Sequence, residues 1–243
     1  MSRKNQPKKP PVNFDPNKFT PLTETQKAVF QSYEDGQNLI LHGYAGTGKS
    51  FVALYLALDD LWNYSDYKKV VIIRSAVPSR NLGFLPGGPE EKVDVFELPY
   101  HKICAKIFSR GDAYKNLKTQ NRVDFESTSF LRGTEFTDSI IIVDEFQNMD
   151  LDELNTVMTR IGKNCKIIVC GDFRQTDFKK DSEKSGIYQF LKIVKRMGEF
   201  DIHEFGIDDI VRSDFVKSWI IESEKVKDES FKSNDVSSCT CRA

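Results

Sequence analysis

Residues 38–50 read Asn38-Leu39-Ile40-Leu41-His42-Gly43-Tyr44-Ala45-Gly46-Thr47-Gly48-Lys49-Ser50, and they are the most informative run in this 243-residue sequence. A short apolar run leads into the pattern G-x-x-x-x-G-K-S, and the Ala- and Leu-rich residues 51–62 follow it. A predicted strand before the pattern and a predicted helix after it are the context in which a phosphate-binding loop occurs. The glycines let successive backbone N–H groups turn towards a phosphate, and the positive end of the helix strengthens that field.

Two side chains of this loop bring a charge and a metal ligand. Lys49 can place its positive charge between the β- and γ-phosphates of a nucleotide, and Ser50 can bind Mg²⁺. Without nucleotide, we expect the Lys49 ammonium group to face solvent. The predicted phosphate-binding residues are Gly43, Tyr44, Ala45, Gly46, Thr47, Gly48, Lys49 and Ser50.

Further apolar runs indicate the sheet into which this loop is built. Residues 69–73, 139–143 and 166–170 are continuous aliphatic runs, and 122–125 is a weaker candidate for another strand. Runs without polar alternation are typical of strands covered by helices on both faces, and hence of a mainly parallel sheet. We therefore predict a three-layer α/β P-loop fold. Residues 83–121 are predicted to be an insertion, with a turn-rich loop and an amphipathic helix over 100–110.

The strand predicted over 139–143 ends in two acidic residues, Asp144 and Glu145. Because a buried carboxylate is costly without a charge partner, a cation beside Asp144 explains its position economically. We predict that Asp144 and Ser50 hold Mg²⁺ and that Glu145 polarises the attacking water. The alternative is that the two acids only cap the next helix.

Two glutamines have side chains suited to a nucleotide. Gln175 follows the strand predicted over 166–170, and its amide can donate and accept hydrogen bonds, so it can sense a γ-phosphate. Gln26 follows a potential N-cap, Thr23, and its amide can pair with the hydrogen-bonding edges of adenine and so favour adenine over guanine. The simpler interpretations are an ordinary loop for Gln175 and an exposed helical position for Gln26.

Composition limits the class of protein. Apolar residues make up 39% of the chain, enough for one sizeable core, and the net charge of -1 gives no support for binding nucleic acid over the whole surface. No apolar run approaches the roughly 20 residues that cross a bilayer, so we expect no membrane contact. An odd number of cysteines, 5, does not suit a disulfide framework, and we expect a reducing cytoplasm. Residues 1–20 and 223–243 are expected to be disordered tails around one domain at 21–222.

Several short motifs of this sequence resemble those that occur together in one known family. They are Gln26, residues 43–50, Arg74-Ser75-Ala76-Val77, Gly83-Phe84-Leu85-Pro86-Gly87, Glu90-Glu91-Lys92-Val93, Phe130-Leu131-Arg132-Gly133-Thr134, Asp144-Glu145-Phe146-Gln147-Asn148, residues 154–162 and residues 171–175. Together they resemble the PhoH-like ATPases, a family similar to the first RecA-like domain of superfamily 1 helicases. The resemblance extends from about Leu22 to Ser223. Residues 83–87 followed by 90–93 discriminate most, because generic P-loop proteins lack them.

The chain departs from the family at three positions. Tyr44 and Ser75 stand where the family usually has Pro, and Phe146 stands where it usually has Ala. The added bulk of Phe146 beside Glu145 could alter coupling to a partner. The loop glycines, Lys49, Ser50 and the acidic pair all match, so these departures leave hydrolysis in place.

The resemblance implies Mg²⁺-dependent hydrolysis of ATP and a link to RNA or single-stranded DNA. The residues it places in catalysis are Glu145, Lys49, Gln175, Gln147 and Arg212. Those it places on a nucleic-acid face are Arg74, Phe84 and Arg132. Three other functions stay open: an ATP-driven switch acting on protein partners, a P-loop kinase, and a nucleotide-binding module without catalysis.

The resemblance also bears on assembly. Superfamily 1 helicases close the ATP site with a second RecA-like domain, whereas this chain has one loop and one acidic pair. A neighbouring copy could supply the missing wall, and because head-to-tail interfaces close into rings, we expect a homo-oligomeric ring with a hexamer favoured. Arg212 resembles an arginine that contacts the γ-phosphate, within its own subunit or across the interface. Arg132 and Arg174 are the alternatives for the crossing role.

Overall fold

A computed structural model describes residues 14–64, 66–75, 89–131, 133–172 and 181–238 of the chain. Six strands form one sheet in the order β3-β2-β4-β5-β1-β6, and all neighbours in it are parallel. The strands are β1 (Asn38–Gly43), β2 (Lys69–Arg74), β3 (Val123–Ser127), β4 (Ser139–Asp144), β5 (Cys165–Gly171) and β6 (Phe200–Phe205).

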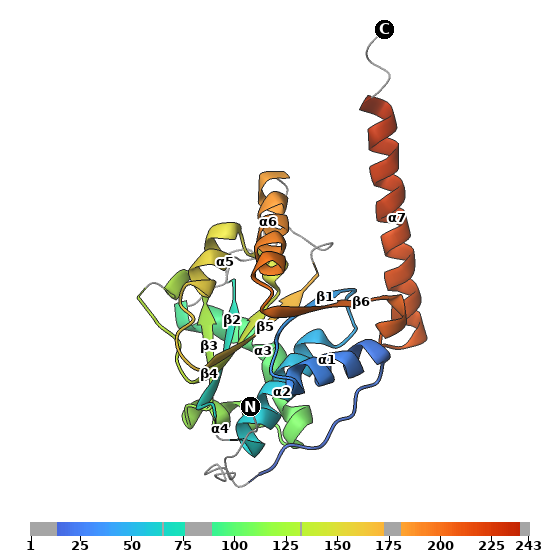
Figure 1. The fold of residues 1–243 in the computed structure, drawn as a ribbon. Helices are drawn as coiled ribbons and strands as arrows, with labels where there is room; N and C mark the ends of the chain where they lie inside the picture. Colours follow the sequence, from blue (N-terminus) through green and yellow to red (C-terminus); the bar gives the residue numbers. More distant parts are fainter. Residues whose placement is uncertain (1–13, 65, 76–88, 132, 173–180, 239–243) are drawn as a thin grey trace.

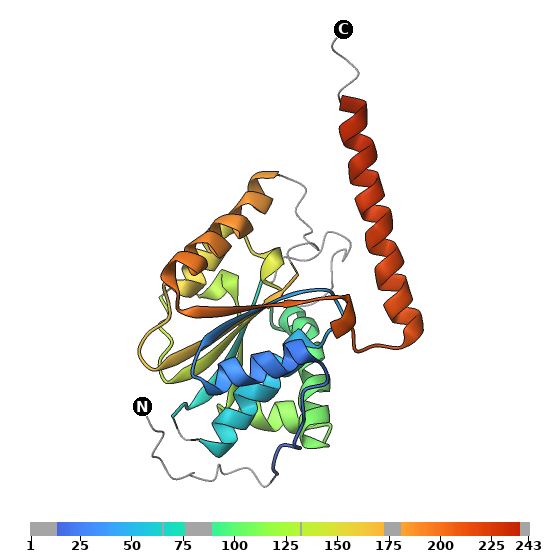
Figure 2. The ribbon, with the colours of Figure 1, turned by 45° about the vertical axis from the view of Figure 1, so that its right-hand side comes forward.

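Helices cover both faces of this sheet, so the fold has three layers (Figures 1 and 2). The helices are α1 (Glu24–Glu34), α2 (Lys49–Asn63), α3 (Pro89–Phe108), α4 (Ala113–Thr119), α5 (Leu151–Met158), α6 (Asp181–Met197) and α7 (Asp214–Ser238). Helices α1 to α4 share one hydrophobic core with the sheet, and α5 and α6 share a second core with its other face. The predicted three-layer α/β fold with a parallel sheet is confirmed.

The two cores explain why the strands are aliphatic at every position. In β4, Ile140 and Ile142 point into the core beneath α1 to α4, whereas Ile141 and Val143 point into the core beneath α5 and α6. All four side chains are buried, and burying each contributes about 1.5–3 kcal/mol relative to leaving it exposed. The strand therefore has no solvent-facing side that could carry polar residues.

Two elements differ from the sequence expectation. Strand β6 was not predicted, because its residues mix acidic with apolar side chains. Within the described residues it pairs with β1 and forms an edge of the sheet. The sequence predicted a helix that begins near Tyr100, directly after Pro99. Helix α3 instead begins at Pro89 and contains Pro99 in its interior. Proline suits the first turn of a helix but usually breaks its interior, so Pro99 misleads a prediction from sequence.

The last helix extends past the predicted domain boundary at residue 222. Helix α7 continues to Ser238, so residues 223–238 are helical where we expected a disordered tail, and α7 leaves the body of the domain (Figures 1 and 2). Good helix formers such as Glu and Lys lower the cost of this polar helix. Among the described residues, no helix combines the length and the apolar character needed to cross a bilayer.

Candidate active site

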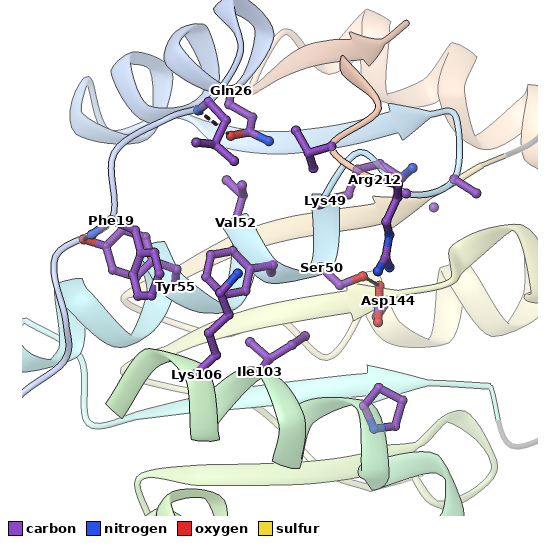
Figure 3. Close-up of a pocket in the computed structure, with 18 of the residues that line it drawn as sticks. Phe19, Gln26, Lys49, Ser50, Val52, Tyr55, Ile103, Lys106, Asp144 and Arg212 are labelled. Carbon is purple, nitrogen blue, oxygen red and sulfur yellow. Dashed lines mark hydrogen bonds between the residues drawn. The ribbon is translucent and has the colours of Figure 1, made fainter. Parts of the chain in front are cut away.

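A cavity of about 640 Å³ opens where β1, β4 and β5 end. Ligands of open α/β sheets bind outside the carboxyl ends of the strands, and this cavity has that position. Its polar end is lined by Lys49, Ser50, Asp144, Glu145, Gln147 and Arg212. Its apolar end is lined by Phe19, Phe30, Phe51, Tyr55 and Ile103, and the Lys106 ammonium group lies over the Phe19 and Phe51 rings. Figure 3 shows Phe19, Tyr55 and Lys106 on one side of the cavity and Lys49, Asp144 and Arg212 on the other.

The loop between β1 and α2 depends on its glycines. Gly46 and Gly48 have φ angles of 77° and 85°, in the left-handed region that favours glycine. Gly43, with φ of 124°, also lies against β6: a Cβ there would be 2.2 Å from the carbonyl oxygen of Phe205. A side chain at Gly43 would therefore separate β1 from β6 at the point where the loop begins.

Lys49 does not face solvent, and that expectation was wrong. Its partly buried ammonium group donates hydrogen bonds to the carbonyl oxygens of Gly43, at 2.8 Å, and Tyr44, at 2.7 Å. Burial lowers the pKa of Lys49, and the negative charge of Asp172 opposes this shift. The loop carbonyls thus hold the ammonium group at the cavity, where an incoming phosphate would compete for the same N–H donors.

Ser50 and Asp144 lie side by side, as residues that share a cation must. Ser50 Oγ donates to Asp144 Oδ1 at 2.8 Å, and Asp144 is buried. A hydroxyl that donates its proton in this way keeps its lone pairs for another partner. Hydroxyl and carboxylate oxygens are ligands that Mg²⁺ accepts, so the two side chains fit the metal.

Glu145 follows Asp144 in a strained conformation. Its φ of 54° is uncommon for a residue with a side chain and recurs at functional sites. Burial and the neighbouring Asp144 raise the pKa of Glu145, and a carboxylate with a raised pKa is a stronger base. Glu145 occupies the N-cap position of the short 3-10 helix Phe146–Asn148, but its side chain makes no capping hydrogen bond there, and the side chain that caps α5 belongs to Asp150.

Gln147 joins the acidic pair to the end of β5. Its amide nitrogen donates to Glu145 Oε2 at 2.5 Å, and its amide oxygen accepts the backbone N–H of Asp172 at 3.0 Å. A Cβ at Gly171 would lie 2.2 Å from that amide oxygen, so this close approach needs glycine. Gln147 therefore holds the Glu145 carboxylate relative to two strands.

Gln26 is buried rather than exposed on its helix. Its amide oxygen accepts the N–H of Leu22 at 2.9 Å, and its amide nitrogen donates to the carbonyl oxygen of Thr47 at 3.1 Å. The predicted N-cap is also present, because Thr23 Oγ1 accepts the N–H of Gln26. Gln26 thus ties α1 to the phosphate-binding loop at the rim of the cavity.

The sequence analysis did not predict the aromatic residues at the apolar end of the cavity. Phe51 and Tyr55 project from α2, Phe19 precedes α1, and the Lys106 ammonium group lies 4.8 Å from the centre of the Phe51 ring. Two aromatic residues four positions apart, directly after Lys49 and Ser50, were the available signal, because such residues share one face of a helix.

Arg212 lines the cavity of its own chain. It precedes α7, and the N–H of Val211 donates to the carbonyl oxygen of Gly46 at 3.1 Å. Figure 3 shows the Arg212 side chain pointing towards Ser50 and Asp144. A Cβ at Gly46 would lie 2.9 Å from Arg212 Cγ, so this glycine leaves room for the arginine.

The residues predicted for nucleic acid are only partly described. Phe84, Arg132, Arg174 and Gln175 lie outside the described residues. Arg74, at the end of β2, places its guanidinium carbon 5.8 Å from the centre of the Phe96 ring, and its charge helps to lower the pKa of Glu145. Arg74 is therefore close enough to the polar end of the cavity to influence the charge of Glu145.

Two departures from the family have structural explanations. Ser75 is buried and its hydroxyl donates to Glu153 Oε1 at 3.1 Å, whereas a proline would have no hydroxyl to donate. Phe146 is fully buried, with its ring centre 6.1 Å from that of Phe190 in α6. The bulk of Phe146 therefore packs inside the domain, and an effect on coupling to a partner stays a prediction.

A glycine-rich loop between β1 and α2, an acidic pair at the end of β4 and a parallel three-layer fold together define a RecA-like, ATPase-type nucleotide-binding protein. The chain belongs to the PhoH-like protein family, whose model matches residues 18–223.

Sequence relatives agree with this assignment. A PhoH-like protein of Synechocystis is 36% identical over 63% of this chain and 46% of its own length. A PhoH-like protein of Bacillus subtilis is 32% identical over 70% of this chain and 53% of its own length. The chain thus spans about half the length of these relatives.

Among solved structures, the UvsW helicase from bacteriophage T4 aligns over 84% of this chain and 64% of that chain, with 18% identity and a TM-score of 0.45.

Proposed function

We propose that this chain hydrolyses ATP with the help of Mg²⁺ and couples the reaction to RNA or single-stranded DNA. The observation that carries the hydrolytic part is the meeting of Lys49, Ser50, Asp144 and Glu145 in one cavity. A positive charge, two oxygen ligands and a basic carboxylate are the groups that phosphoryl transfer to water requires.

Each residue has a distinct task in this proposal. Lys49 exchanges its bonds to the loop carbonyls for bonds to the phosphates. Glu145, oriented by Gln147, accepts a proton from the attacking water, and Arg212 stabilises charge that develops on the γ-phosphate. When bound, Mg²⁺ held by Ser50 and Asp144 supplies positive charge that neutralises phosphate oxygens.

The choice of ATP rests on the far end of the cavity. With phosphates at the loop, the base would extend towards Gln26 and the rings of Phe19 and Phe51. The Gln26 amide has an N–H and a lone pair beyond those bonded to Thr47 and Leu22, so it can still meet an adenine edge. Aromatic rings add a surface on which a base can stack.

Glu145→Gln is expected to slow ATP turnover by about 10²-fold or more while ATP binding is retained. The amide preserves the shape of the side chain but cannot accept the proton, and general-base catalysis commonly contributes 10²–10⁴-fold. Phosphate release gives turnover, and a fluorescent ATP analogue gives binding. Glu135→Gln, at an exposed position, is the matched control. Loss of ATP binding would instead assign Glu145 to the metal site.

RNA or single-stranded DNA is expected to raise the rate of ATP turnover, and duplex DNA is expected to do so less. The motifs shared with the PhoH-like ATPases and the position of Arg74 at a strand end support this part of the proposal. Phosphate release is measured with each nucleic acid at several salt concentrations, because phosphate contacts by Lys and Arg weaken as salt rises.

The same assay separates the alternatives. A rate that none of the three nucleic acids changes would contradict the nucleic-acid part, leave hydrolysis intact and favour an ATP-driven switch acting on proteins. The kinase alternative has less support, because Arg110, the arginine of the inserted region, donates to Asp112 at 2.7 Å and stacks on Phe14.

A further inference from the structure

Tyr100 connects the inserted helix α3 to the proposed metal site. Its hydroxyl donates to Asp144 Oδ2 at 2.7 Å, and its side chain is only 1% exposed. The roles assigned to the loop and the acidic pair do not use this contact.

The hydrogen bond completes a two-sided hold on Asp144. Ser50 Oγ donates to one carboxylate oxygen at 2.8 Å, and Tyr100 donates to the other. A carboxylate can accept about four hydrogen bonds, so each oxygen still has a lone pair for a cation or water. With both oxygens anchored, the carboxylate cannot rotate about its terminal bond without breaking a buried hydrogen bond.

Packing fixes Tyr100 in turn. Tyr100, Cys104 and Ile107 are spaced as i, i+4 and i+7 on α3 and are buried in the core beneath α1 to α4. Pro99 and Ile103, on the adjacent face of α3, line the cavity itself. Helix α3 therefore forms part of the cavity wall and also carries the tyrosine that donates to the Asp144 carboxylate.

We propose that Tyr100 is a positioning residue, which holds the Asp144 carboxylate in the orientation that binds the nucleotide-associated divalent cation. The inference rests on the proposed function, because it assigns a task to that metal site. Residues that orient metal ligands typically change metal affinity or activity by about 10- to 100-fold when they are mutated.

A matched pair elsewhere in the fold provides the control. Tyr33 in α1 also buries its ring and donates to a carboxylate, Asp60 Oδ2, at 2.8 Å. Tyr33 and Asp60 do not line the cavity. Tyr100→Phe and Tyr33→Phe therefore remove the same kind of hydrogen bond and keep both rings, one beside the proposed metal ligand and one away from it.

The experiment measures Mn²⁺ binding in the presence of a non-hydrolysable ATP analogue, by electron paramagnetic resonance of free Mn²⁺. We expect the dissociation constant for Mn²⁺ to rise about 10-fold or more in Tyr100→Phe and to stay at the wild-type value in Tyr33→Phe. Thermal unfolding without metal or nucleotide should shift similarly in both variants, since each loses one buried hydrogen bond.

A double variant tests whether Tyr100 acts through Asp144. Adding Tyr100→Phe to Asp144→Asn should not weaken Mn²⁺ binding beyond the loss in Asp144→Asn alone. A further loss would place the effect of Tyr100 elsewhere and overturn the inference. This comparison also stands if Tyr100→Phe is less stable than its control.

The remaining outcomes are equally decisive. Unchanged or tighter Mn²⁺ binding in Tyr100→Phe, or equal weakening in both Phe variants, would leave Tyr100 as a core residue with a satisfied hydroxyl. If the wild-type protein binds the analogue but no Mn²⁺, the metal part of the proposed function fails, and the role of Tyr100 fails with it.

Discussion

Lys49→Ala is expected to abolish measurable ATP turnover while the protein stays folded. The ammonium group lies at the polar end of the cavity, where its charge would meet the β- and γ-phosphates, and alanine supplies neither charge nor donors. Phosphate release measures turnover, and thermal unfolding measures the fold. Lys68→Ala, which removes an exposed lysine paired with Asp138, is the control for loss of one positive charge.

The contacts of Lys49 call for a second variant. Because its ammonium group also bridges the carbonyls of Gly43 and Tyr44, Lys49→Ala could loosen the loop as well as remove the charge. Lys49→Met retains the aliphatic stem and should be equally inactive if the charge is what matters. Full turnover in either variant would overturn the proposed hydrolysis of ATP.

Arg212→Ala is expected to lower the turnover number by about 10³-fold with little change in ATP binding. An arginine that stabilises the charge on a transferring phosphoryl group contributes roughly 10³–10⁵ in related enzymes. The side chain lies beside Gly46 and points towards Ser50 and Asp144, so it can reach this region without a second subunit (Figure 3). Turnover is measured at saturating ATP, and Arg196→Ala in α6 serves as a control.

Mixing two inactive chains separates action within a subunit from action between subunits. Because Arg212 lines the cavity of its own chain, an Arg212→Ala chain mixed with a Lys49→Ala chain should recover no turnover. Recovery would show that Arg212 completes a neighbouring site. The ring itself stays a prediction, which light scattering of the wild-type protein tests, and Arg132 and Arg174 stay predicted alternatives for a crossing role.

The fold was predictable because its main signals are local. Ile140 to Val143 are aliphatic without interruption, and Gly46 and Gly48 occupy positions that need left-handed backbone. Such patterns reflect burial on both faces and the steric limits of the backbone, which act on each residue wherever the rest of the chain lies. The nearness of Ser50 and Asp144 followed, because β1 and β4 lie in one parallel sheet with only β5 between them, and their carboxyl ends are at the same edge.

The neighbours of these residues could not be predicted, because long-range packing chooses them. Tyr100 reaches Asp144 across 44 positions and Gln26 reaches Thr47 across 21, and neither partner follows from a local pattern. Strand β6 likewise forms because β1 offers it a free edge, although its own residues are half polar. The sequence alone therefore predicted the loop, the other strands of the parallel sheet and the acidic pair. The tertiary structure determined which side chains contact the loop and the acidic pair, because a buried polar group forms its hydrogen bond with whichever partner the packing places near it.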